Sequence, residues 1–297
     1  MADTMTLYQV INNPDIIPVF FDKTGIKLNV MSSFAYRDGI FSTLTKKYRH
    51  LINLLVLDSG AYSVFTGKTK ISLKEYALFL KRYGDLFDHC FSLDDKFDDA
   101  EHNFENQAIL ENVLEGKGWR PIPVVHDWDA FKEFEMYVNL KHTYIALGSM
   151  GEKQRISLDI LGKIRTEYPD IKVHMFGTLN FEMLRKYRPA SADASTWAQQ
   201  AGKGGSSYDW RTNENEGYYY NVGGKDSKTS ELKHIKKSPL YDEMTEFWRK
   251  QFGYTFDTIV SDSSARQIIN LYYFTQMEDY LNSPEAEALG IVKKAQN

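Results

Sequence analysis

Carboxylates at the ends of short apolar runs are the residues of this chain best suited to catalysis. Residues 54–57 (LLVL) pass without a break into Asp58, Ser59 and Gly60, which predicts a buried strand with an acid at its carboxyl end. A carboxylate there loses its hydration, a cost that pairing or a functional use offsets. Asp58 is therefore a candidate catalytic acid, and the alternative is that it caps the turn formed with Ser59 and Gly60.

Polar or small residues follow the other predicted strands in the same way. They are Asp94 and Asp95, His126 and Asp127, Gly148 to Gly151, Gly177, and Asp193. Three acids on three different strands, with small residues between them, predict a pocket lined by carboxylates and exposed backbone. Such a pocket suits either a metal ion or the cleavage and transfer of a glycosidic bond.

The spacing of the apolar segments predicts an α/β fold, and Ser72 with Glu75 forms a capping-box pattern at one helix start. The predicted strands cover residues 27–34, 54–57, 89–93, 121–125, 143–147, 172–176 and 191–197. The predicted helices cover 73–83, 101–115, 129–140, 157–168 and 180–187. Because strands and helices alternate about every 30 residues, we expect a TIM-type (β/α)8 barrel. A doubly wound sheet is the alternative, although no Gly-x-Gly-x-x-Gly pattern follows the first strand.

The composition excludes several classes of protein. A chain of 297 residues with a net charge of −4 predicts one large domain over residues 1–297, without the global basic field common in nucleic-acid binders. The single cysteine, Cys90, rules out an internal disulfide and a Cys-rich zinc site. Because the sequence shows neither a signal-peptide pattern nor a long apolar run, we expect a soluble, cytoplasmic protein without a membrane partner.

Residues 199–240 interrupt the alternation and predict an insertion. The segment is rich in Gly, Ser, Asn and Tyr, and Lys233, Lys236 and Lys237 form a candidate patch for contact with phosphates. The alternative is a solvated loop. A helix over residues 263–281 follows, and its aromatic and apolar residues predict packing against the barrel wall.

Five short motifs between residues 30 and 202 resemble those of one known family. The motifs are LDSGAYS (57–63), FSLDD (91–95), ALGSMGE (146–152), HMFGT (174–178) and SADASTW (191–197). In order and position they resemble the queuine and archaeosine tRNA-guanine transglycosylases, and the DNA-acting relatives that place 7-deazaguanine bases in phage and bacterial DNA. The resemblance implies a barrel glycosyltransferase that exchanges guanine for a 7-deazaguanine base.

The resemblance also implies a role for individual residues. Asp58 would be the general acid/base, and Asp193 would be the nucleophile that forms a covalent bond with the sugar. Tyr62 would stack on the purine. Asp94 would accept hydrogen bonds from N1–H and the exocyclic amine of guanine, a pair of donors that few other bases present.

Further candidate base contacts lie at the strand ends. By the resemblance, Gly148 and Ser149 would meet the base through their backbone groups. Ser59 and Gly177 lie at strand ends beside the other candidates. His126 is a candidate for contact with the edge of the base, and the alternative is a structural hydrogen bond.

Two other residues of this region are expected to have structural roles. His174 lies within a predicted strand, which favours a hydrogen bond in the core or the wall. Trp197 is expected to pack in the wall, with stacking on a base as the alternative.

The chain differs from the tRNA-acting members in its metal chemistry. Those members usually carry a zinc site of three cysteines and a histidine after the nucleophile, and here no cysteine follows Asp193. We therefore expect no zinc subdomain, no metal and no redox cofactor. We also expect DNA rather than tRNA as the partner, and a free 7-deazapurine base as second substrate. A protein partner or a homodimer is compatible with the sequence.

Other functions would use the same residues. Water in place of the incoming base would give a DNA glycosylase that excises a base, including a modified one, in defence against phage. Action on tRNA is a second alternative. The acids and His126 could instead hold a metal ion for hydrolysis, or the barrel could bind nucleic acid without catalysis.

Overall fold

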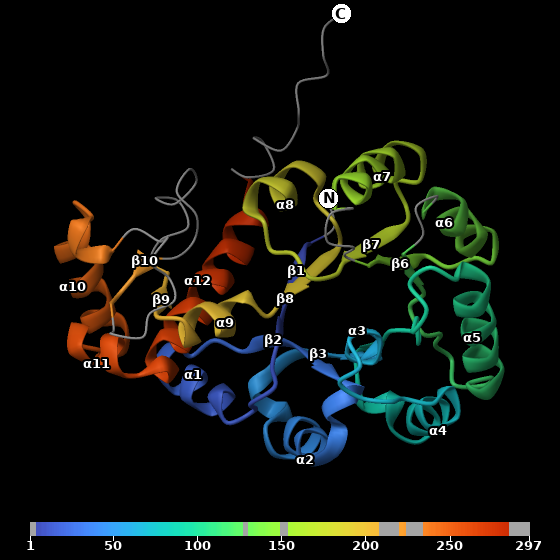
Figure 1. The fold of residues 1–297 in the computed structure, drawn as a ribbon, viewed down its shortest axis with the longest axis horizontal. Coiled ribbons are helices and arrows are strands. Elements are labelled where there is room, and N and C mark those ends of the chain that lie inside the picture. Colours follow the sequence, from blue (N-terminus) through green and yellow to red (C-terminus); the bar gives the residue numbers. More distant parts are fainter. Residues whose placement is uncertain (1–3, 127–129, 149–153, 208–219, 224–233, 285–297) are drawn as a thin grey trace, which may run out of the picture.

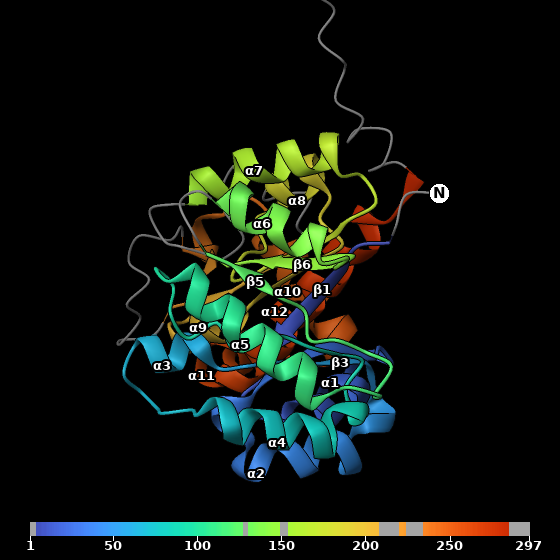
Figure 2. The same ribbon diagram turned by 90° about the vertical axis from the view of Figure 1, so that its right-hand side faces the viewer.

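The computed structural model describes residues 4–126, 130–148, 154–207, 220–223 and 234–284. Eight strands form one curled sheet in the order β4-β3-β2-β1-β8-β7-β6-β5, and helices surround it (Figure 1, Figure 2). The paired strands within it are parallel. The strands are β1 (Thr6–Val10), β2 (Leu28–Ser33), β3 (Ile52–Asp58), β4 (His89–Cys90), β5 (Val124–Val125), β6 (Tyr144–Leu147), β7 (Lys172–Met175) and β8 (Ser191–Ala194).

The two outermost strands of this order, β4 and β5, are joined just beyond their ends. Phe91 forms a parallel bridge with Ile122. The amide of Ser92 donates to the carbonyl of Ile122 at 2.8 Å, and the amide of Ile122 donates to the carbonyl of Cys90 at 2.8 Å. The edges of the curled sheet therefore meet, which makes the α/β fold compatible with the expected TIM-type barrel.

Alternate residues of each strand face opposite sides of the sheet. The larger apolar cluster includes helix residues such as Leu80 and Leu184, so it lies between the sheet and the helices. The smaller cluster contains only buried residues of strands or their ends, so it fills the inside of the curled sheet. Its buried members are Tyr8, Met31, Val56, Phe91, Ile122, Val124 and Ala146.

The helices follow the strands along the chain, and one of them begins with the predicted capping box. The Ser72 hydroxyl accepts from the amide of Glu75 at 3.2 Å, and the Glu75 carboxylate accepts from the amide of Ser72 at 3.4 Å. The helices are α1 (Ile16–Thr24), α2 (Arg37–Ser42), α3 (Ala61–Phe65), α4 (Leu73–Tyr83), α5 (Ala100–Val113), α6 (Ala130–Asn139), α7 (Gln154–Glu167), α8 (Phe181–Tyr187), α9 (Thr196–Gly202), α10 (Tyr241–Phe252), α11 (Phe256–Ser261) and α12 (Ser263–Leu281).

The first strand of the structure was not predicted from the sequence. The strand β1 lies in the middle of the sheet between β2 and β8, whereas the prediction began the sheet at residue 27. The apolar run at residues 16–21 belongs to helix α1. The sequence of β1, TLYQV, carries the buried polar side chain of Gln9, so it lacks the continuous apolar character of the run before Asp58.

Three predicted strands are shorter than expected. The strand predicted over residues 191–197 ends with β8, because Thr196 and Trp197 belong to helix α9. The strand predicted over residues 89–93 is regular only in β4, and the one predicted over 121–125 is regular only in β5. Pro121 and Pro123 lack the amide hydrogen that a regular ladder requires, so pairing before β5 is limited to the bridge at Ile122.

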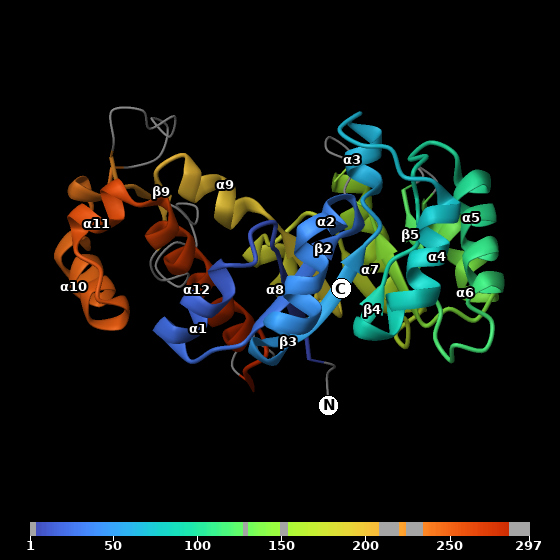
Figure 3. The same ribbon diagram turned by 90° about the horizontal axis from the view of Figure 1, so that it is seen from below.

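The chain after β8 extends the molecule to one side of the sheet. Figure 3 shows α10 and α11 at one end of the molecule and α5 and α6 at the other, with α12 nearer the strands. The carboxylate of Glu278 in α12 accepts from the amide of Leu7 at 3.0 Å and from the Asn29 side chain at 2.9 Å. The helix therefore packs against β1 and β2, and its bounds coincide with the predicted 263–281.

The predicted insertion at 199–240 is described only in part. Its described residues include the antiparallel pair β9 (Gly205–Ser206) and β10 (Tyr220–Asn221) and a short turn of 3-10 helix at Ile235–Lys237. Residues 208–219 and 224–233 lie outside the described residues. Over the part of the chain that the structure describes, no helix has both the length and the apolar character needed to cross a membrane.

Candidate active site

A cavity of about 590 Å³ opens at the carboxyl ends of the strands. This volume is within the usual range for ligand pockets, roughly 300–1,000 Å³. Six lining residues come from six strands that succeed one another in the chain, either from the strand itself or from the residues after it. They are Asp58 (β3), Asp94 (after β4), His126 (after β5), Gly148 (after β6), Gly177 (after β7) and Asp193 (β8).

The three acids predicted from the sequence therefore share one cavity. Asp94 and Asp193 are 6 % and 5 % exposed, and Asp58 is half-buried. The pKa of Asp58 is raised to about 7, mainly by burial, and the negative charges of Asp94 and Asp193 act in the same direction. Asp58 therefore interacts electrostatically with both of the other acids.

Asp58 is held at the turn between β3 and α3. Its Oδ2 accepts from the amide of Gly60 at 3.1 Å, and this contact and the hydroxyl of Ser33 act to lower its pKa, against the larger effect of burial. Gly60 has a φ of +87°, and a Cβ at this position would lie 2.9 Å from the Cβ of Ala35. Only glycine fits this turn, so the Asp-Ser-Gly order has a geometric reason.

Asp94 is held by two side chains. The hydroxyl of Ser59 donates to its Oδ1 at 3.2 Å, and Nε2 of His126 contacts its Oδ2. His126 thus makes a structural hydrogen bond and also lines the cavity, so the two alternatives drawn from the sequence are compatible. A Cβ at Gly148 would lie 1.9 Å from Cε1 of His126, which explains why a glycine follows β6.

Asp193 lies on β8, and both of its described hydrogen bonds end on the same oxygen. The amide of Gly177 donates to Oδ1 at 3.0 Å, and Nε2 of His174 lies 3.3 Å from Oδ1. None of the described hydrogen bonds reaches Oδ2. The amide of Gly177, a predicted base contact, is therefore bonded to the acid.

Tyr62 lies on α3 at the cavity and is 65 % exposed, so one face of its ring is accessible to a ligand. The ammonium of Lys68, which also lines the cavity, lies 6.0 Å from the centroid of the Tyr62 ring. An exposed aromatic ring beside buried carboxylates suits stacking on a planar base.

Sequence analysis missed a stack of three rings beside Tyr62. Phe65, 63 % exposed on α3, stacks on Phe97 with 4.6 Å between ring centroids, and Phe97 stacks on His126 at 4.1 Å. Phe97 lies three residues after Asp94, so its closeness to a predicted strand end was the available signal. Ser33 and Lys68, which line the cavity, were also missed.

Other residues predicted for the site lie away from the cavity or outside the described residues. Ser149 and Lys233 are outside the described residues. Lys236 and Lys237 are exposed on the turn before α10 and do not line the cavity. Trp197 is 3 % exposed in the apolar cluster between sheet and helices, as expected for wall packing.

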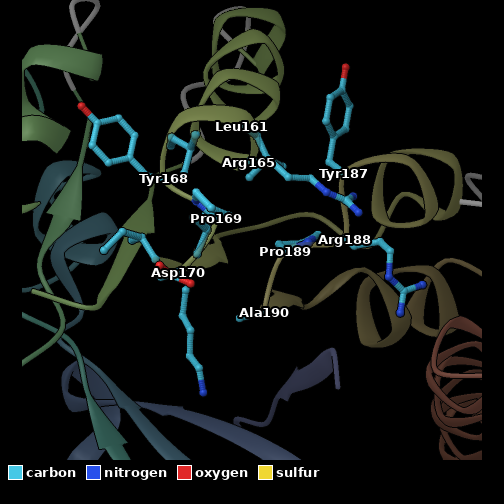
Figure 4. A pocket seen from close by; sticks show the side chains of 13 residues that line it. Leu161, Arg165, Tyr168, Pro169, Asp170, Tyr187, Arg188, Pro189 and Ala190 are labelled. Atoms are coloured by element: carbon cyan, nitrogen blue, oxygen red, sulfur yellow. The ribbon is translucent and has the colours of Figure 1, made fainter. Parts of the chain in front are cut away.

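A smaller hollow of about 170 Å³ lies between α7 and α8 and contains none of the predicted site residues. Tyr168 and Tyr187 flank it (Figure 4). Its lining includes Arg165 and Arg188, whose guanidinium groups also donate to backbone carbonyls of Lys186 and Leu281. These arginines thus contribute to the packing of the helices around the sheet.

Within the described residues, no group of three or more His, Cys, Asp and Glu side chains is placed to hold a metal ion. Comparison of the chain with protein-family models finds no match, and comparison with curated proteins finds none either. A function for this chain can therefore be inferred only from the geometry of the cavity residues and from the resemblance of the sequence motifs.

Proposed function

We propose that this protein is a guanine transglycosylase that exchanges guanine in a nucleic acid for a 7-deazaguanine base. The observation that carries the proposal is that Asp58, Asp94 and Asp193 line one cavity at the ends of three strands. Their positions in the barrel suit the three roles that base exchange requires: a proton carrier, a receptor for the purine edge and a nucleophile.

The two proposed catalytic acids have different surroundings. Asp58 is close to half-protonated at neutral pH because its pKa is raised to about 7, which suits a group that both gives and takes a proton. Asp193 accepts two hydrogen bonds on Oδ1, which hold the carboxylate in one orientation, as a nucleophile requires. Two carboxylates with such different environments divide the same work in retaining glycosidases.

The proposed reaction has two displacements at C1′ of the target nucleotide. Oδ2 of Asp193 attacks C1′ while the bond from C1′ to N9 of guanine breaks, and guanine leaves with the electron pair and a proton from Asp58. N9 of the incoming 7-deazaguanine then gives its proton to Asp58 and attacks C1′. This second step releases the Asp193 carboxylate, so both acids return to their starting states.

Asp94 is the proposed receptor for the Watson–Crick edge of guanine. Ser59 and His126 each occupy one acceptor site on it, and a carboxylate has about four such sites, so it retains the capacity to accept from N1–H and the exocyclic amine. A base without those donors would leave the remaining acceptor sites of a buried carboxylate unused and would therefore bind less tightly than guanine. Tyr62 would stack on the base once the base has left the stacked bases of the nucleic acid.

DNA is the proposed nucleic acid, because the resemblance is closest in character to the compact, DNA-acting branch of the family. The decisive experiment incubates DNA and, separately, tRNA with the protein and an isotopically labelled 7-deazaguanine, followed by mass spectrometry of the nucleosides. We expect labelled nucleoside in DNA and release of one guanine for each base inserted.

The outcomes separate the alternatives. Release of a base with abasic sites and no incorporation would indicate hydrolysis and contradict exchange. Incorporation into tRNA alone would show that tRNA, and not DNA, is the substrate. No change in either nucleic acid would contradict the proposed function. The variant Asp193→Asn is the matched control, since it keeps the size of the side chain and removes the nucleophilic carboxylate.

A further inference from the structure

Four side chains form a hydrogen-bonded chain through the barrel interior to Asp193. The hydroxyl oxygens of Tyr144 and Ser191 lie 2.6 Å apart, and the Ser191 oxygen lies 2.6 Å from Nδ1 of His174. Nε2 of His174 lies 3.3 Å from Oδ1 of Asp193. His174 and Ser191 are 0 % and 1 % exposed, so water does not replace these partners.

The strand geometry explains why the four groups meet. Tyr144 lies on β6, His174 on β7, and Ser191 and Asp193 on β8. Ser191 and Asp193 are two residues apart, so their side chains leave the same face of β8. His174 is the register partner of Ser191 across β7 and β8, and therefore its ring reaches both residues.

The direction of each hydrogen bond follows from the first donor. The phenol of Tyr144 has one described partner, Ser191, and burial raises its pKa to about 12, so it keeps its proton at neutral pH. A phenol is a stronger hydrogen-bond donor than an aliphatic hydroxyl, so the half-buried Tyr144 donates to the Ser191 oxygen. The Ser191 proton is then directed to its other described partner, Nδ1 of His174.

A nitrogen that accepts a hydrogen bond carries no proton. Nδ1 of His174 is thus unprotonated, and the ring proton is on Nε2, where it can be donated to Oδ1 of Asp193. The other end of the chain requires the same state, since an unprotonated Nε2 facing a carboxylate oxygen would be repulsive. Both ends therefore select a neutral ring protonated on Nε2.

We infer that Tyr144, Ser191 and His174 are positioning residues that hold Oδ1 of Asp193 and leave Oδ2 directed to the sugar. Tyr144 and Ser191 act by fixing the tautomer of His174, and His174 acts by donating to the acid. The assignment to a reaction step rests on the proposed function, whereas the tautomer does not depend on it.

The direct test is long-range ¹H–¹⁵N NMR of the wild-type protein labelled with ¹⁵N, with the His174 signals assigned by their loss in His174→Gln. We expect one protonated nitrogen, Nε2, and one unprotonated nitrogen, Nδ1. Protonation on Nδ1 alone, or on both nitrogens, would overturn the inference. The protonation state is read from the wild-type protein, in which the relay of Tyr144, Ser191, His174 and Asp193 is intact, and the variant serves only to assign the signals.

Removal of the first donor tests the order of the chain. In Tyr144→Phe the Ser191 proton is free to turn away from His174, so we expect a second population of His174 with Nδ1 protonated. Tyr168→Phe is the matched control, because its hydroxyl donates to Glu135 on the outside of the barrel. A single unchanged population in Tyr144→Phe would contradict the part assigned to that tyrosine.

The effect on the reaction is tested by two substitutions of His174 that differ in one donor. Gln keeps an N–H group near the position of Nε2, and Leu does not. We expect His174→Leu to slow guanine release in a single turnover roughly tenfold, the loss for one hydrogen bond to a charged group, without weakening base binding, and His174→Gln to recover most of it. Equal rates in the two variants would contradict the positioning role.

Failure of this inference is distinguishable from failure of the proposed function. If the wild-type protein exchanges no base but His174 is protonated on Nε2, the proposed function fails and the relay stands. If exchange occurs and His174 is found in another protonation state, the relay fails and the proposed function stands.

Discussion

Asp58 and Asp193 carry the same side chain in two different environments. Burial and two neighbouring acids raise the pKa of Asp58, while Gly177 and His174 hold Asp193 through one oxygen. The proposed roles of proton carrier and nucleophile follow from this difference and not from the residue type. Substitutions that keep the size of each side chain are therefore the most informative.

Asp193→Asn should reduce base exchange by at least about 10³-fold, because an amide cannot form the covalent bond to the sugar. Binding of the free base should change little, since Asp94 and Tyr62 are intact. The measurement is the single-turnover rate together with the affinity for the base. Asp170→Asn, an exposed acid by the smaller hollow, should behave as wild type. Full activity in Asp193→Asn would exclude it as the nucleophile.

Asp58→Asn should stabilise the fold at alkaline pH. The pKa of Asp58 is raised from 3.8 to about 7 on folding, so its favourable contribution is complete below pH 3.8 and is lost as the pH rises through 7. Asparagine does not titrate. The free energy of unfolding of the variant relative to wild type should rise by about 2 kcal/mol between pH 5 and pH 8, measured by urea denaturation. A pH-independent difference would contradict the raised pKa.

At the scale of the elements, the site depends on how closely the ends of neighbouring strands approach. The residues after β5 and β6 supply His126 and Gly148, and the absence of a side chain at Gly148 allows the imidazole to reach Asp94. The Phe97 and Phe65 rings then stack outward from His126 toward solvent. One glycine thus determines the position of the proposed base receptor, Asp94, and of the aromatic stack beside it.

Gly148→Ala should force His126 away from Asp94, because the new Cβ would lie 1.9 Å from the ring. We expect a loss of about 1–3 kcal/mol in the free energy of unfolding and weaker binding of guanine. Gly162→Ala in α7 is the control, since its Cβ would meet the nearest atom, of Tyr187, at an ordinary 3.5 Å. Wild-type stability and guanine affinity in Gly148→Ala would show that the contact with His126 is unimportant.

At the scale of the whole molecule, charge is the main obstacle to nucleic-acid binding. The protein has a net charge of −4, and the described lining of the cavity includes three acids and one lysine, Lys68. Phosphates must therefore be bound by a local basic surface rather than by a general positive field. Lys236 and Lys237 are exposed on the turn before α10, and they are part of the basic patch predicted to contact phosphates.

Replacement of Lys236 and Lys237 by Ala should weaken DNA binding and reduce its dependence on salt. Each lost phosphate contact should lower the slope of log affinity against log salt by about 0.7–0.9. Fluorescence anisotropy of a labelled oligonucleotide at several salt concentrations measures both effects. The control replaces Lys74 and Lys81, two exposed lysines of α4. An unchanged slope would place DNA binding elsewhere.

Most strands and their polar ends were predictable from the sequence because both signals are local. The run before Asp58, the Asp94 and Asp193 tips and the capping box of α4 each occupy a few consecutive residues. The strand β1 was not predicted, because Gln9 interrupts the apolar character of its sequence. In the structure β1 lies between β2 and β8, and the side chain of Gln9 is buried. Sequence pattern alone does not reveal that a polar residue is buried.

What the sequence by itself determined is the set of acids and glycines at the strand ends and the α/β alternation that carries them. The tertiary structure decided which of these groups touch: His126 with Asp94, and His174 with Asp193 and Ser191. His174 was expected to be structural, and it is buried, but its partner is the proposed nucleophile. Such contacts depend on strand register and on the meeting of the sheet edges, which join residues far apart in the chain and leave no local pattern.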